Sequence, residues 1–182
     1  MFLALDIGNS IVTCGVFHNK KCIHTLRIQS NLHFWNKFIT LQEYKITDAA
    51  ISSVVPRLTI VYMESIKNIF HIDAFIIRHN NSEVVLDVKS PSEVGSDRIC
   101  NTAAAVELIG CPAIIGDIGS ATNYDVVDQK GSFIGGSIAP GLKTAAQNLI
   151  EKAALLKETA FMAPDSAIGR DTATNLQSGI ML

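Results

Sequence analysis

The sequence lacks any apolar run near the roughly 20 residues that a membrane-spanning helix needs. It also lacks the basic residues that open a secretory signal peptide, and Asp6 interrupts the apolar N-terminus too early for one. Both absences argue against a membrane partner and against export. We therefore expect a soluble, cytoplasmic protein.

A surplus of one charge is missing as well. The chain has 15 Lys and Arg against 17 Asp and Glu, for a net charge of −2, and its basic residues form no cluster. This pattern gives no electrostatic footprint for nucleic acid. The four cysteines show no CxxC or Cys/His metal spacing. We expect them to be reduced thiols, as is usual in a cytoplasmic protein.

The chain has 182 residues, of which 48% are hydrophobic, and this is enough for a sizeable core. Three β-rich runs open the chain at residues 2–5, 11–17 and 22–28, separated by polar turn sequences. A helical period follows at residues 31–44, and an alanine-rich segment at 97–109 predicts a further helix. Strands and helices in this order predict an α/β fold.

One sequence motif occurs twice along the chain. LDIGNSIVTCGV, beginning at Leu5, and IGDIGSATNYDVV, beginning at Ile115, both place an apolar strand, an acid, a glycine and a small polar residue before a second strand. Two copies favour two half-domains of similar topology. We place them at residues 1–111 and 112–182.

The two turns have the composition of phosphate-binding turns. Gly8 permits a tight turn whose backbone N–H groups could point at an anion, with donors on Asn9 and Ser10 beside them. Asp6 would then hold Mg²⁺ or its water, because this cation takes carboxylate and phosphate oxygens. The alternative is a plain hairpin turn in which Asp6 bonds its own backbone. The second copy, led by Asp117, favours the phosphate interpretation over turns kept for folding alone.

A third candidate is SPSEVGSDRIC, residues 90–100. Asp97 would lie near a helix N-terminus, where the dipole stabilises a carboxylate able to accept a proton. Arg98 offers a fork for a carboxylate or a phosphate. The alternative is a helix cap next to a surface arginine, and the residues alone do not decide between the two.

Six ordered motifs carry a resemblance to a known family. In chain order they are DIGNS, SSVVP, PSEVGSDRICN, DIGSATNYD, GGSIAPGL and GRDTATNLQSGI. In this order and spacing the chain resembles the type III pantothenate kinases. The resemblance implies two ribonuclease-H-like domains with mixed sheets, of the actin-like ATPase superfamily, with ATP bound between them. It also implies phosphorylation of pantothenate, the first step of coenzyme A synthesis, by a homodimer that uses Mg²⁺ with ATP and a monovalent cation, K⁺ or NH₄⁺.

The family's functional residues carry over by position. The resemblance implies an ATP-phosphate loop at Asp6, Ile7, Gly8, Asn9, Ser10, Ile11, Val12 and Thr13, with Asp6 associated with Mg²⁺. Its substrate-binding motif falls on Gly95, Ser96, Asp97 and Arg98, and its proton acceptor on Asp97. The monovalent cation falls on Asp117, a further ATP contact on Ser120, and a substrate contact on Thr172.

Two departures from the family pattern leave a second function open. Val88 stands at a substrate-contacting position where the family usually has tyrosine, and loss of a hydrogen-bonding partner weakens recognition. The family also continues tens of residues further, so we expect a shortened second domain. The alternatives are a catalytically impaired homologue kept as a binding or accessory module, and a superfamily enzyme acting on another small hydroxyl compound.

Overall fold

The structure, a computed structural model, describes residues 1–156, 159–160 and 162–181. Within this part the chain forms two compact units that are not continuous in sequence. The first contains residues 1–113 and 126–135, and the second contains residues 114–125 and 136–182. Division of the chain at residues 111 and 112 stays a prediction.

The first unit is built on a five-stranded mixed sheet in the order β3-β2-β1-β4-β5. The strands are β1 (Phe2–Ile7), β2 (Ile11–His18), β3 (Lys21–Gln29), β4 (Asp48–Ser53) and β5 (Phe75–Ile76). The first three strands form an antiparallel meander, as the turn sequences predict, while β4 runs parallel to β1 and to β5. This places the carboxyl ends of β1 and β4 at the same edge of the sheet.

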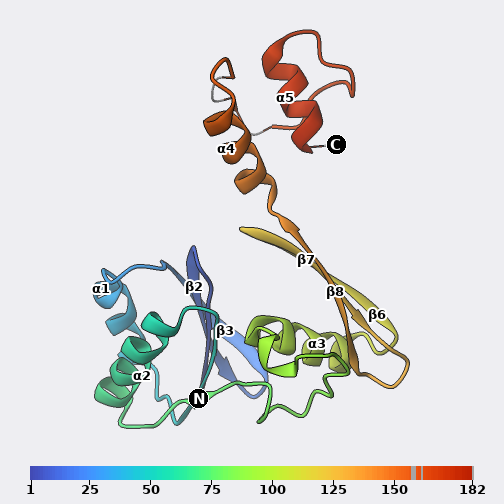
Figure 1. The fold of residues 1–182 in the computed structure, drawn as a ribbon. Coiled ribbons are helices and arrows are strands. Elements are labelled where there is room, and N and C mark those ends of the chain that lie inside the picture. Colours follow the sequence, from blue (N-terminus) through green and yellow to red (C-terminus); the bar gives the residue numbers. More distant parts are fainter. Residues whose placement is uncertain (157–158, 161, 182) are drawn as a thin grey trace. The chain divides into compact units, whose positions relative to one another are not determined.

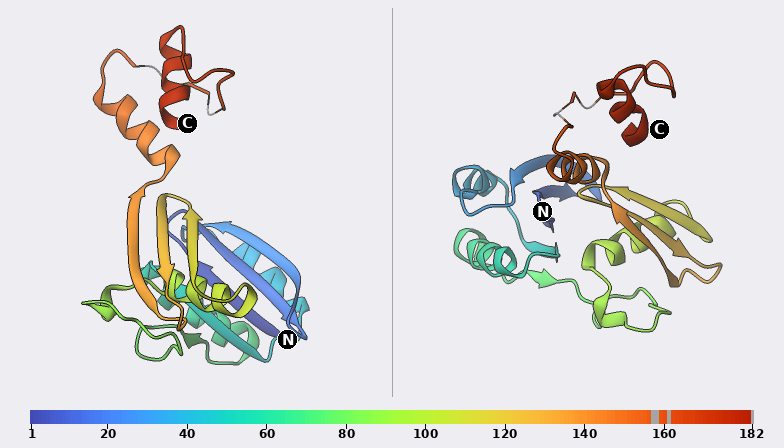
Figure 2. Two further views of the ribbon diagram at one scale, coloured as in Figure 1. Left: turned by 90° about the vertical axis from the view of Figure 1, so that its right-hand side faces the viewer. Right: turned by 45° about the horizontal axis from the view of Figure 1, so that its top comes forward.

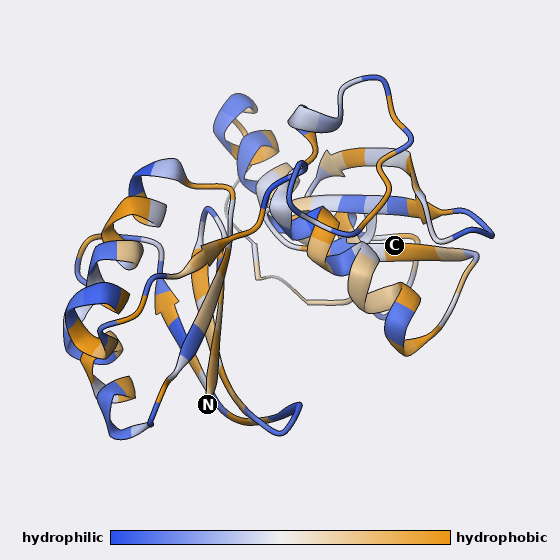
Figure 3. Cartoon of the chain, turned by 90° about the horizontal axis from the view of Figure 1, so that it is seen from below, coloured by the Kyte–Doolittle hydropathy of each residue, from blue (hydrophilic) through white to orange (hydrophobic). Residues whose placement is uncertain are grey.

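Helices cover both faces of this sheet (Figure 1). The helical elements of the first unit are α1 (Trp35–Phe38), the 3-10 helix η1 (Ile39–Glu43), α2 (Pro56–Phe70), the 3-10 turn η2 (Pro91–Glu93) and α3 (Ser96–Leu108). The expected helix at residues 31–44 is thus shorter and breaks into α1 and η1. In Figure 1 α1 and α2 lie on one side of the strands and α3 on the other. Along α1 and α2, hydrophilic and hydrophobic residues alternate in bands (Figure 3), as expected for helices with one buried face.

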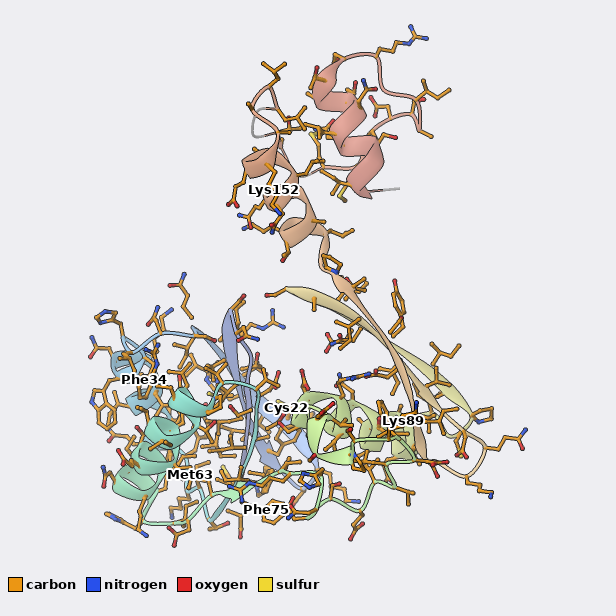
Figure 4. The ribbon with its side chains drawn as sticks, in the orientation of Figure 1. Cys22, Phe34, Met63, Phe75, Lys89 and Lys152 are labelled. Carbon is orange, nitrogen blue, oxygen red and sulfur yellow. The ribbon has the colours of Figure 1, made fainter. Side chains whose placement is uncertain are left out.

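The core of the first unit lies between the sheet and the helices α1 and α2. Every second residue of β1 points into this core. These residues are Leu3, Leu5 and Ile7, and all three are almost fully buried. Side chains on this side include Phe34 and Met63, both labelled in Figure 4. Because side chains alternate along a strand, burying these residues turns the side chains between them to the opposite face. Asp6 therefore belongs to the face away from the core.

Three aromatic rings bind α1 to α2. The centroids of Phe34 and Tyr62 are 4.3 Å apart, and the ring of Phe38 meets Tyr62 edge-on at 5.1 Å. Burial raises the pKa of the Tyr62 phenol. Such pairs add to the hydrophobic contribution of burying the rings. This cluster holds the short helix α1 against the unit.

A three-stranded sheet follows along the chain in the order β6-β7-β8. Its strands are β6 (Ala113–Ile118), β7 (Ala121–Val127) and β8 (Phe133–Pro140), seen side by side in Figure 2. Residues 126–135, at the end of β7 and the start of β8, belong to the first unit, where Leu86 bridges Phe133. The second unit adds α4 (Leu142–Lys152) and α5 (Thr172–Met181), which pack against each other. All four cysteines are free thiols, as expected.

Replacement of Phe38 by alanine tests the aromatic cluster. Phe38 is 0% exposed, so the variant should lose about 3–5 kcal/mol of unfolding free energy through lost burial and the cavity left behind. Trp35, on the same helix, is 44% exposed and serves as the control. Urea unfolding should show a clearly smaller loss for Trp35→Ala. Equal losses would contradict the packing described.

Candidate active site

Asp6 lies at the carboxyl end of β1, on the face of the sheet away from the core. It pairs in register with Thr13 on β2 and with Ser52 on β4. Its neighbours Leu5 and Ile7 are buried, whereas Asp6 itself is exposed. Residues opposite one another on neighbouring strands share a face, so a carboxylate and two hydroxyls form one polar row. The carboxylate suits a hard cation, and the two hydroxyls can donate to phosphate oxygens.

One backbone donor of the turn after Asp6 is used within the turn itself. The Gly8 N–H donates to the Ile11 carbonyl at 3.1 Å, so this N–H closes the turn and is not directed at an anion. Anion binding by the other N–H groups of the turn stays a prediction. Asn9 and Ser10 are exposed and are the polar residues that the turn presents. Within the predicted loop, the side chains of Ile7 and Val12 are buried in the core. These two residues could meet a ligand only through their main chain.

The start of α3 is fastened to the end of β4 by the buried hydroxyl of Ser96. Its Oγ accepts the Ser53 N–H at 2.7 Å and lies 3.1 Å from the Ser53 carbonyl and from the Ser52 hydroxyl. A hydroxyl can both accept and donate, so one side chain satisfies several groups at this strand end. Ser96, predicted to bind substrate, is thus engaged within the protein. Its contacts fix where α3 begins.

Asp97 lies in the first turn of α3, where the helix dipole stabilises a carboxylate. Its Oδ1 accepts the Arg98 N–H at 2.8 Å. A Cβ on Gly95 would overlap that same oxygen and would lie 3.4 Å from the Val54 side chain. The Asp97 carboxylate can therefore occupy this position only because residue 95 is a glycine. This requirement holds whether or not Gly95 also contacts substrate.

Cys100, one turn into α3, shows which groups lie together. Partial burial is the main cause that raises the pKa of its thiol. A hydrogen bond with Ser52 lowers that pKa, and the negative charges of Asp6 and Asp97 raise it further. Both carboxylates therefore lie close enough to the thiol to affect its pKa. The first unit brings Asp6, Asp97, Ser52 and Cys100 into one neighbourhood.

Sequence reasoning missed Ser52 and Cys100 as members of this neighbourhood. Ser52 stands in the quoted motif SSVVP, and Cys100 is expected from the sequence only to be a reduced thiol. The signal for Ser52 is a polar residue at the end of a buried strand that runs parallel to β1. That pairing between distant segments is not visible in the sequence.

Two other predicted substrate residues lie near the β8 segment of the first unit. The Arg98 guanidinium stacks over the Phe133 ring, 5.0 Å from its centroid. Cation–π contacts of this kind orient an arginine without neutralising it. Val88 lies beside Gly135, whose constructed Cβ would be 4.0 Å from the valine side chain.

The second turn, in the second unit, repeats the closure of the first. The Gly119 N–H donates to the Ala121 carbonyl at 2.9 Å, as Gly8 does to Ile11. The Ser120 carbonyl accepts the Gly141 N–H at 3.0 Å and the Thr144 hydroxyl at 2.7 Å. A Cβ on Gly141 would overlap the Gly119 carbonyl. The start of α4 is therefore built onto this turn, next to Asp117 and Ser120.

Thr172 begins α5, and the residue before it caps the helix. Asp171 Oδ1 accepts the Thr174 N–H at 2.8 Å, and this hydrogen bond is the main cause that lowers the pKa of Asp171. Asp171 is therefore the N-cap of α5. Thr172 itself is exposed.

No group of three or more His, Cys, Asp or Glu side chains suited to a metal is found among the described residues. A nucleotide-bound Mg²⁺ does not require one, because it is usually held by one or two carboxylates together with phosphates and waters. Asp6, with hydroxyls on both neighbouring strands, fits that requirement. Asp117 is the carboxylate that precedes the second turn.

These features define the class of protein. A mixed sheet of this order, with an acid at the end of its first strand and a second sheet that repeats the acid-and-turn device, is the ribonuclease-H-like arrangement of the actin-like ATPases. The predicted fold class is confirmed. A family model described as type III pantothenate kinase matches residues 2–182, and the chain belongs to that family.

Relatives named type III pantothenate kinase agree with this assignment. The chain is 38% identical to the one from Thermomicrobium roseum, over all of this chain and 75% of the relative. It is 36% identical to the one from Agathobacter rectalis, over all of this chain and 74% of the relative. The chain thus spans about three quarters of their length.

Among solved structures, the fold is similar to that of a protein titled a conserved putative Baf family transcriptional activator from Campylobacter jejuni. The TM-score is 0.57 at 19% identity, over 97% of this chain and 72% of the other. At this identity the likeness concerns the fold alone.

Replacement of Ser96 by alanine tests the fastening of α3 to β4. The buried groups of Ser53 would lose their partner, which should cost about 1–3 kcal/mol of unfolding free energy. Ser92, exposed on the preceding 3-10 turn, is the matched control, and Ser92→Ala should change stability little. Urea unfolding of both variants measures the difference. Equal stability of the two variants would show that the Ser96 contacts contribute nothing.

Proposed function

We propose that this chain phosphorylates pantothenate at the expense of ATP, with Asp97 as the general base. The observation that carries the proposal is the placement of Asp97 at the start of α3, in the same neighbourhood as Asp6 at the end of β1. Membership of the type III pantothenate kinase family supports the choice of substrate. The product would be 4′-phosphopantothenate, the first intermediate of coenzyme A synthesis.

The reaction would be an in-line phosphoryl transfer. The primary hydroxyl oxygen of pantothenate attacks the γ-phosphorus, the bond to the bridging oxygen breaks, and ADP leaves. Asp97 takes the hydroxyl proton. Little covalent chemistry is required of the protein, so positioning and charge neutralisation supply most of the rate.

Roles for the remaining residues follow from their places in each unit. Asn9 and Ser10 would bind phosphate oxygens at the first turn, and Ser120 would do so at the second. Asp6 would hold the Mg²⁺ that accompanies ATP, and that ion would neutralise charge on the phosphates. Asp117 would hold a monovalent cation. Gly95, Arg98, Thr172 and Val88 would contact pantothenate, with Val88 supplying apolar contact only.

We further propose a cytoplasmic homodimer, on the strength of the family resemblance. The structure contributes one finding on location: none of the helices it describes is long and apolar enough to cross a membrane.

No observation on the described residues favours the alternative of a non-catalytic accessory module. The kinase proposal is supported by Asp6 at the end of β1 and by Asp97 in the first turn of α3, which Ser96 joins to β4. The alternative stays distinguishable, because such a module could bind nucleotide but would not turn it over.

An assay of pantothenate-dependent ADP release, with Asp97→Asn as the test variant, separates the two functions. Loss of the base should lower kcat about 10²–10⁴-fold while nucleotide binding persists. Glu93→Gln removes a nearby exposed carboxylate and is the control. It should retain normal turnover. Absence of pantothenate-dependent turnover in the unmodified chain, or turnover that Asp97→Asn leaves unchanged, would refute the proposal.

A further inference from the structure

A hollow of about 370 Å³ lies at the edge of the first unit's sheet, where β3 leads toward α1. Ile11 of β2 forms one wall. The polar residues that line it come from β3, α1 and the chain between them: Arg27, Gln29, Asn31, His33 and Lys37. None of the predicted site residues except Ile11 belongs to this lining. The hollow is thus a separate feature of the molecule.

The charge of the hollow differs from that of the chain. The sequence carries a net charge of −2, yet none of the described residues lining the hollow is acidic. Its ionisable side chains are Arg27, His33 and Lys37, and none of them forms an ion pair with a described carboxylate. Arg27 and Lys37 are two cationic side chains in one concave site whose described lining holds no carboxylate, and such a site attracts an anion.

Arg27 also belongs to the polar row that contains Asp6. It pairs in register with Thr13, which pairs with Asp6, which pairs with Ser52. These four residues therefore share one face across four strands. With neighbouring strands about 4.8 Å apart, the backbone of Arg27 lies about 10 Å from that of Asp6. An arginine side chain can span much of that separation.

The hollow adjoins the first turn through Ser30. The Ser30 N–H donates to the Ser10 carbonyl at 3.0 Å, and its hydroxyl donates to the Gly8 carbonyl at 2.6 Å. These bonds fasten the chain just after β3 to the turn that follows Asp6. The hollow and the turn are consequently held side by side.

We propose that this hollow is an anion-binding site that takes a phosphate group, with Arg27 as its principal ligand and Lys37 and His33 as further donors. The planar guanidinium presents paired N–H groups that match two phosphate oxygens, and the ammonium of Lys37 adds a point charge. Gln29 and Asn31 bond each other at the rim, at 3.3 Å. The phosphate belongs either to the nucleotide held at the first turn or to a separate phosphorylated compound.

Calorimetric titration with pyrophosphate alone tests the site in the 182-residue chain. Each charge-assisted hydrogen bond to the anion contributes enough that Arg27→Gln should weaken binding about tenfold. Lys37→Gln should weaken it by a smaller factor. Lys21→Gln, at the other end of the same strand and exposed, is the matched control and should bind like the unmodified chain. Arg27 is exposed as well, so unchanged thermal unfolding should show that its variant folds.

A second titration, with ATP already bound, identifies the source of the phosphate. Displacement of pyrophosphate by ATP assigns the hollow to the nucleotide, and simultaneous binding assigns it to a separate ligand. The proposal is overturned if the unmodified chain binds no pyrophosphate, or if Arg27→Gln and Lys21→Gln bind it equally. Because binding is measured without turnover, the result is independent of whether the chain phosphorylates pantothenate.

Discussion

The hydroxyl of Ser96 fixes the start of α3 to the end of β4, and the candidate site of the first unit depends on that contact. Strand β4 is parallel to β1, so its end lies beside Asp6. Joining α3 to this strand end brings Asp97 and Cys100 to the same edge. A buried hydroxyl that satisfies a strand's last polar groups thereby also positions a carboxylate for chemistry. Gly95 completes the arrangement, because no larger residue leaves room for the Asp97 oxygen.

The face of the first sheet opposite the core carries a continuous row of polar side chains. Ser52, Asp6, Thr13 and Arg27 form a row on the face opposite the core. The core side chains between them hold that row rigid, since any slip of one residue would exchange the two faces. Both turns use a glycine N–H to close the turn itself. Recognition of phosphate would therefore fall to neighbouring residues such as Asn9 and Ser10.

Much of this could be predicted from the sequence, because alternation and turn chemistry are local properties. The meander at β1–β3, helix α3 and the twin turns follow from residue order alone. The pairing of β1 with β4 does not, because it joins segments more than 40 residues apart in the chain. For that reason Ser52 escaped notice, and so did Cys100, which lies near Ser52 on α3. The hydrogen bond from the Gly8 N–H to the Ile11 carbonyl could not be predicted either, because turn composition does not show which carbonyl a donor reaches.

We propose that the end of β1, the end of β4 and the start of α3 form one substrate site. Cys100 lies among Asp6, Ser52 and Asp97, so its rate of alkylation reports on occupation of that site. Mass spectrometry should show that pantothenate with Mg–ATP slows alkylation of Cys100 and leaves that of exposed Cys22 and Cys111 unchanged. Equal rates at Cys100 with and without both substrates would show that no substrate binds beside Cys100.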